Sequence, residues 1–203
     1  MFPTSGLVPP RVRSFVRAIA MAAVIVAVVA GCTGEAGPSF DPTGPCTSDG
    51  AAEGAYPELE ALVPVAYEGR APDRLDSGRN CTATNLGSFQ QRGIDEVRFA
   101  GGTWDFGSNI AVVLAVFTAE GLTTETMAEW WRTTAQTAGR TQITGESRPL
   151  IGGEQAYRLD TKTGERIQSV VVWPAGEDRV NVVLSHNLPD PKIDAGIEAF
   201  GAE

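Results

Sequence analysis

The sequence is poor in histidine and cysteine, the residues that most often bind metals or attack substrates. It has 203 residues but a single histidine, His186, and three cysteines. No CxxC or HExxH spacing occurs, so we expect no zinc site and no other metal centre. A GxSxG elbow, a phosphate-binding P-loop and a GxGxxG turn after a strand are also missing. The sequence therefore predicts no cofactor, and no motif identifies a catalytic residue.

Positive charge is scarce as well. Among sixteen basic residues only Lys162 and Lys192 are lysines, and 25 acidic residues bring the net charge to −9 at pH 7. This acidic balance argues against nucleic acid as a partner and against electrostatic binding to anionic lipid head groups. An acidic surface that keeps the protein dispersed is the simplest interpretation, and an affinity for cationic partners stays open.

Long hydrophobic runs are limited to one, at residues 18–30. A membrane-spanning helix needs about 20 apolar residues, so this run is too short to span comfortably. Arg11, Arg13 and Arg17 precede it without any acidic residue. A positive segment, a short apolar run and small residues at its end have the order of a secretory signal peptide. The arginines are not adjacent, so we expect export by the general secretory route.

The end of this run reads Val29-Ala30-Gly31-Cys32. Small residues directly before a cysteine resemble the lipobox of bacterial lipoproteins, although Val29 stands where the motif usually has leucine. The resemblance implies removal of residues 1–31 and a diacylglyceryl group on the Cys32 thiol. That lipid would anchor the protein to the extracytoplasmic face of the cell membrane. An ordinary signal peptide and an uncleaved anchor are the alternatives.

The two remaining cysteines, Cys46 and Cys81, form an even pair in a chain that we expect to be exported. Such a pair is typically a disulfide in an oxidising compartment. The bond would close a loop of about 36 residues, which the chain-entropy model values at roughly 4 kcal/mol. Two free thiols are the alternative.

Composition divides the mature chain into two parts. The stretch up to residue 55 is rich in Gly, Pro, Ser, Thr and Asp and lacks hydrophobic periodicity, which is typical of a flexible tether. We therefore expect a signal peptide at residues 1–31, a tether at residues 32–55 and one folded domain at residues 56–203. Loss of residues 1–31 removes three arginines and no acidic residue, so the mature net charge is −12 by the same count.

Two elements of the domain stand out. Residues 110–117 are apolar on both faces of a strand, as expected for a strand buried in the centre of a sheet. Residues 124–138 have apolar positions at helical spacing, with Thr123 placed as the N-cap. Weaker patterns predict short helices at residues 57–62 and 83–91, a last helix capped by Asp190, and strands at residues 94–99, 155–160, 166–173 and 179–185.

The order of these elements predicts the fold class. Turn residues such as Lys162-Thr163-Gly164 indicate hairpins between the last strands. We expect an α+β fold, in which helices pack on one face of an antiparallel β-sheet. The strand at 110–117, the helix at 124–138 and a meander opened by Gly152-Gly153 resemble the plan of PsbP/Mog1 and LpqN-type exported lipoprotein domains. This resemblance concerns architecture and implies no catalytic residue.

A few residues remain as candidates for chemistry. No spacing joins His186 to a serine and an aspartate, so we expect it at a strand end on the surface. Asp95-Glu96 and Glu177-Asp178 are adjacent pairs beside loops, and we expect solvated charges there. We expect Gly101-Gly102 and Gly152-Gly153 to form turns.

These observations favour a membrane-anchored extracytoplasmic lipoprotein whose domain is a non-enzymatic binding or interaction module. Lipid on Cys32 would hold it at the membrane, and its partner would be an envelope protein, a lipid or a glycan. Of the four tryptophans, Trp130 and Trp131 point about 100° apart on a helix, so one could reach the surface and contact a partner. The alternative is an envelope hydrolase with a site near His186.

Overall fold

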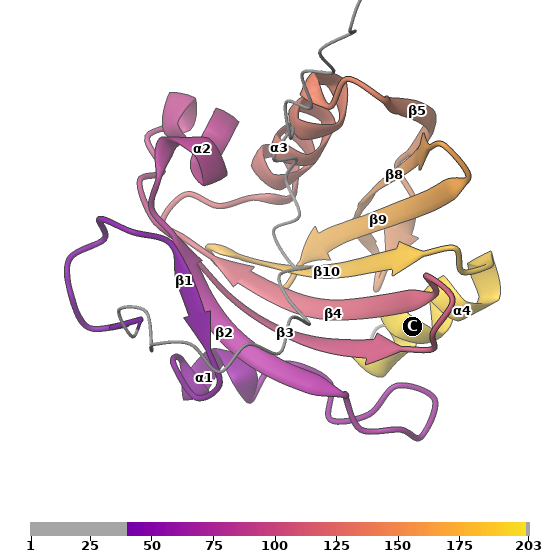
Figure 1. Cartoon of the computed structure of the whole chain (residues 1–203), viewed down its shortest axis with the longest axis horizontal. Coiled ribbons are helices and arrows are strands. Elements are labelled where there is room, and N and C mark those ends of the chain that lie inside the picture. The colour runs from indigo at the N-terminus through magenta and orange to yellow at the C-terminus, as the bar shows by residue number, and fades with distance from the viewer. Residues whose placement is uncertain (1–39, 202–203) are drawn as a thin grey trace, which may run out of the picture.

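The computed structural model describes residues 40–201, so the expected signal peptide and Cys32 lie outside the described residues. An eight-stranded antiparallel sheet runs through the molecule in the order β1-β2-β3-β4-β10-β9-β8-β5 (Figure 1). The α+β fold class expected from the sequence is therefore confirmed. No helix within residues 40–201 is long and apolar enough to cross a membrane.

The strands of the main sheet are β1 (Gly50–Ala52), β2 (Arg74–Asn80), β3 (Val97–Asp105), β4 (Ala111–Thr118), β5 (Thr141–Ser147), β8 (Tyr157–Thr163), β9 (Arg166–Pro174) and β10 (Arg179–His186). A separate hairpin pairs β6 (Leu150–Ile151) with β7 (Glu154–Gln155) around Gly152-Gly153, the turn that the sequence predicts. The helices are α1 (Pro57–Glu60), α2 (Ala83–Leu86), the 3-10 helix η1 (Gly87–Arg92), α3 (Thr124–Thr137) and α4 (Asp190–Ala199).

Strand β4 lies in the middle of the sheet and is buried on both faces. Val113, Ala115 and Phe117 belong to one hydrophobic cluster, whereas Leu114 and Val116 belong to clusters on the opposite face. The doubly apolar run at residues 110–117 predicts this placement, because a strand between two covered faces has no polar side.

The helices divide between the two faces of the sheet, so the expectation that all of them pack on one face is wrong. Met127 and Trp130 of α3 pack with the cluster of Val113 and Phe117. On the other face α4 approaches so closely that a Cβ on Gly196 would lie 3.1 Å from Leu114 Cδ2. Figure 1 shows α3 and α2 on one side of β4, with α1 and α4 on the other. A sheet centre that is apolar on both faces needs cover on both.

Helix α3 begins where the sequence predicts. Thr123 is the N-cap, its Oγ1 accepts from Thr126 N at 3.2 Å, and Thr126 Oγ1 accepts from Thr123 N at 2.9 Å. Trp130 is buried in a stack with Phe89 at 5.6 Å between ring centroids, and its Nε1 donates to Asn85 O at 3.1 Å. These contacts hold η1 and α2 against α3.

Strand β3 runs straight through Gly101-Gly102, so the expected turn at these glycines is wrong. A Cβ on Gly102 would lie 2.9 Å from the ring of Trp104. That ring is fully buried, and its Nε1 donates to Arg70 O at 2.9 Å. Glycine is needed here to make room for an aromatic ring two residues along the same face.

Residues 40–55 belong to the folded domain, so the expected tether at residues 32–55 is wrong for the part that the structure describes. Gly50, Ala51 and Ala52 of β1 pair with β2 at the edge of the sheet. Cys46 and Cys81 form the expected disulfide, with 5.3 Å between their Cα atoms. Residues 40–55 are ordered although they lack hydrophobic periodicity. Polar contacts with residues far along the chain hold them in place.

Candidate functional site

Two loops meet at the end of the sheet where β10 begins. The residues 175–178 connect β9 to β10, and residues 119–123 connect β4 to α3. Asp178 joins them: its carbonyl accepts from Ala119 N at 3.1 Å and from Thr118 Oγ1 at 2.9 Å, while its Oδ1 accepts from Gly121 N at 2.9 Å. The φ angle of Asp178 is 56°, a left-handed conformation that aspartate adopts more readily than most residues.

A hollow of about 1010 Å³ opens on one side of this junction. Its lining includes Arg92, Asp95, Glu96, Arg98, Thr118, Glu120 and Asp178. Arg92 is bound to Glu129 at 2.7 Å and Arg98 to Glu96 at 2.7 Å. Within residues 40–201, Asp95, Glu120 and Asp178 form no ion pair, so the hollow carries an excess of negative charge.

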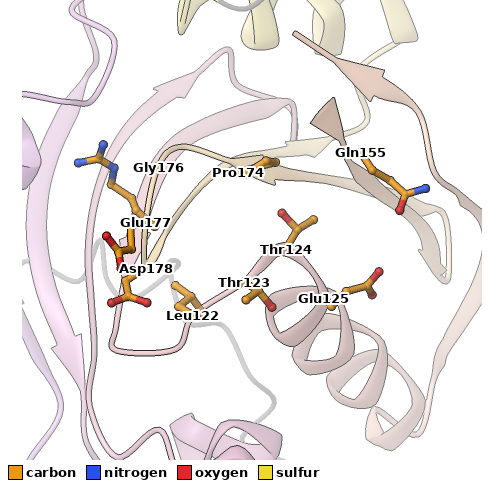
Figure 2. Close-up of a pocket in the computed structure, with 10 residues that line it drawn as sticks. Leu122, Thr123, Thr124, Glu125, Gln155, Pro174, Gly176, Glu177 and Asp178 are labelled. Atoms are coloured by element: carbon orange, nitrogen blue, oxygen red, sulfur yellow. The ribbon is translucent and has the colours of Figure 1, made fainter. Parts of the chain in front are cut away.

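A second hollow, of about 430 Å³, lies on the other side of Asp178. Figure 2 shows Glu177 and Asp178 on one side of it and Thr123, Thr124 and Glu125 of the α3 start on the other. Glu125, the first acidic residue of α3, already accepts a hydrogen bond from Arg148, and this bond lowers the pKa of its carboxyl group. Both hollows thus offer carboxylates and loop backbone to a ligand.

His186 lies at the opposite end of β10 from these hollows. It is seven residues from Arg179, or about 23 Å along an extended strand. Burial, followed by the positive charge of Arg166, lowers its pKa, so the ring is neutral at pH 7. Its Nδ1 is buried without a hydrogen-bond partner, and no serine or cysteine of the described chain is bonded to the ring.

The structure brings together residues that the sequence analysis treated as separate. Asp95-Glu96 and Glu177-Asp178 are 82 positions apart, yet all four residues line the larger or the smaller hollow. None of the four tryptophans lines either hollow. Trp104, Trp130 and Trp173 are buried, and Trp131 is half-buried against the hydrophobic cluster that contains Trp130. No group of three or more His, Cys, Asp or Glu side chains within residues 40–201 is placed to hold a metal ion.

No family model matches this chain, and no curated protein sequence matches it.

Proposed function

We propose that this protein is an exported lipoprotein, anchored through Cys32 at the extracytoplasmic face of the membrane, whose domain binds a partner in the envelope. The observation that carries the proposal is the Cys46–Cys81 disulfide. It accounts for two of the three cysteines and leaves Cys32, behind its signal-like segment, as the remaining one. A disulfide is typical of an oxidising compartment, so it supports export independently of the first 32 residues.

The hollows beside Asp178 support a binding role. Their carboxylates are not accompanied by a histidine or a cysteine, and the Thr118 hydroxyl is donated to the Asp178 carbonyl. An excess of negative charge in a concave site attracts a positively charged group. The ligand that fits is therefore a cationic segment of an envelope protein or an amine-bearing glycan or lipid.

The anchor is tested by intact-mass spectrometry of the protein extracted from native membranes. We expect loss of residues 1–31, a diacylglyceryl adduct, and a mass two hydrogens lower from the disulfide. Cys32→Ser should abolish the adduct and membrane retention. Cys46→Ser/Cys81→Ser is the matched control, since it removes the other two cysteines and leaves Cys32 unchanged. A wild-type chain recovered without lipid would refute the proposal.

The binding site is tested with a lysine-rich peptide as the probe, titrated calorimetrically at low and moderate salt. Asp95→Asn/Glu120→Gln should weaken binding several-fold, because it removes two unpaired charges of the larger hollow. Glu53→Gln/Glu58→Gln removes the same charge from exposed positions outside the hollows. Equal weakening by both double variants would mean that the net charge of −12, and no particular site, attracts the peptide.

A further inference from the structure

An apolar segment is exposed immediately after α1. Residues 61–66 read Ala-Leu-Val-Pro-Val-Ala, six consecutive residues without a charge or a hydrogen-bonding side chain. Leu62 is 42% exposed and Val65 is 87% exposed, whereas Val63 between them is buried. Single exposed apolar residues are ordinary, but two large apolar side chains exposed within one short uncharged segment form a candidate contact surface.

The segment is fixed to the part of the domain from which the chain leads back to Cys32. Phe40, the first described residue, packs on the same hydrophobic cluster as Leu59 and Val63. Tyr56 Oη also donates to Pro42 O at 3.3 Å. In Figure 1 the indigo start of the described chain lies close to α1, on the same side of the sheet.

Chain length then limits how far the segment can be from a lipid on Cys32. Cys32 precedes Phe40 by eight residues, which span at most about 28 Å when fully extended. The cluster of Leu59 and Val63, next to Leu62 and Val65 in the chain, therefore stays near the membrane surface once Cys32 is lipidated. This confinement raises the local lipid concentration, so even a weak contact would be populated.

The nearest acidic residue on each side of the segment is engaged by the domain. Glu60 Oε1 accepts from Gly54 N at 2.7 Å and from Ser77 Oγ at 2.8 Å, so this carboxylate is turned into the protein. Glu68, at the other end, is bonded to Lys192. The apolar run thus stands between two acidic side chains that are both engaged by the domain.

We propose that residues 61–66 form a second membrane contact, in which Leu62 and Val65 enter the interfacial region of the bilayer beside the lipid on Cys32. The inference rests on the proposed lipid anchor. Burial of apolar side chains provides the affinity, as in interfacial membrane segments, and electrostatic attraction does not. Because the mature chain is strongly acidic, the contact is stronger on zwitterionic than on anionic lipid.

The test uses the lipidated mature protein in phosphatidylcholine nanodiscs that contain a nitroxide-labelled lipid. Methyl NMR resonances of Leu62 and Val65 should broaden, whereas those of Leu150 should not. Leu150 is the matched control, since it is 73% exposed but lies on the β6–β7 hairpin. In Leu62→Ser/Val65→Ser the broadening of neighbouring methyls such as Val63 should fall roughly tenfold, and Leu150→Ser should leave it unchanged.

The possible results separate the two proposals. A lipidated protein whose Leu62 and Val65 methyls broaden no more than those of Leu150 would overturn the second contact and leave the anchor intact. Protection of these methyls from water without broadening would assign the surface to a protein partner and also overturn it. A protein without lipid on Cys32, read from the mass of its N-terminal peptide, would overturn both.

Discussion

At the scale of single residues, Arg79 shows how a polar N-terminal stretch is held in place. Its side chain is 4% exposed, and its guanidinium donates to the carbonyls of Gly44 at 2.8 Å and of Asp41 and Pro45 at 3.1 Å. Glu96 lies 3.8 Å from the same group. A buried cation stabilises a fold only if its hydrogen-bond acceptors compensate for the water that it loses on burial.

Arg79→Met should lower the free energy of unfolding by about 3 kcal/mol, because three carbonyls lose a charged donor in a buried site. Urea denaturation measures the change. Arg92→Met is the matched control: Arg92 is exposed and its partner Glu129 is partly exposed, so the loss should stay below about 0.5 kcal/mol. A similar fall in the free energy of unfolding in both variants would show that the buried contacts of Arg79 add no more stability than a surface ion pair.

Asp49 makes stability depend on pH. Burial acts to raise its pKa, but hydrogen bonds from Thr82, from the Cys81 amide and from Asn85 together outweigh burial and lower the pKa. A carboxyl whose pKa is lower in the folded state contributes stability above its unfolded pKa of about 3.9 and loses it as the pH falls through the folded pKa. Stability should therefore fall below about pH 4.

Asp49→Asn should be less stable than the wild type at pH 7 and should lose less stability than the wild type between pH 4 and pH 2. Urea titrations at several pH values give both quantities. Glu53→Gln removes an exposed carboxylate from the next turn and should leave the pH profile unchanged. A wild-type profile that is flat below pH 4 would contradict the role given to Asp49.

At the scale of elements, Gly78 decides whether β1 can join the sheet. A Cβ at this position would lie 2.2 Å from Gly50 O and 2.7 Å from Ala51 Cβ, both on β1. Gly78→Ala should therefore displace β1, with a loss of about 2 kcal/mol and faster hydrogen exchange of the β1 amides. Gly139→Ala is the control, because nothing lies within 4 Å of its added Cβ. Unchanged exchange in β1 would show that the strand adapts.

The sequence predicts those elements that have a regular hydrophobic spacing or are stabilised by residues close together in the chain. Strand β4 and helix α3 follow from their hydrophobic spacing, and the Thr123 cap follows from its neighbours. Strand β2 could not be found this way, because its inward residues are polar. Ser77 is fully buried, yet its Oγ accepts from Tyr56 N at 2.7 Å and donates to Glu60. Partners so far along the chain leave no periodic signal.

The candidate site could not be predicted from the sequence for a related reason. The carboxylate pairs are visible as charges beside loops, but nothing in their spacing says that the loops meet. The meeting depends on Asp178 accepting from Ala119 and Gly121, nearly sixty residues earlier. Only the pairing of β10 with β4 brings these positions together. For His186 the reverse holds. Its residue type made it a candidate for catalysis, but it lies at the end of β10 farthest from the hollows.

At the scale of the whole molecule, the disulfide closes a loop that contains β1, α1 and all of β2. Cys46 lies in the N-terminal segment that Arg79 holds, and Cys81 adjoins the Asp49 contacts. The same two ends are thus joined by a covalent bond and by buried hydrogen bonds. In the chain-entropy model the covalent bond acts mainly on the unfolded state, whereas the hydrogen bonds act on the folded one.

Cys46→Ser/Cys81→Ser should therefore lower the free energy of unfolding by about 2 to 4 kcal/mol while the β1 amides stay protected under native conditions. Urea denaturation measures the first effect and native-state hydrogen exchange the second. Cys32→Ser, which lies outside the loop, should change neither. Loss of β1 protection in the double variant would mean that the disulfide itself, and not Arg79 and Asp49, keeps residues 40–55 on the sheet. In that case reduction would release the segment and lengthen the reach of the domain from the proposed lipid on Cys32.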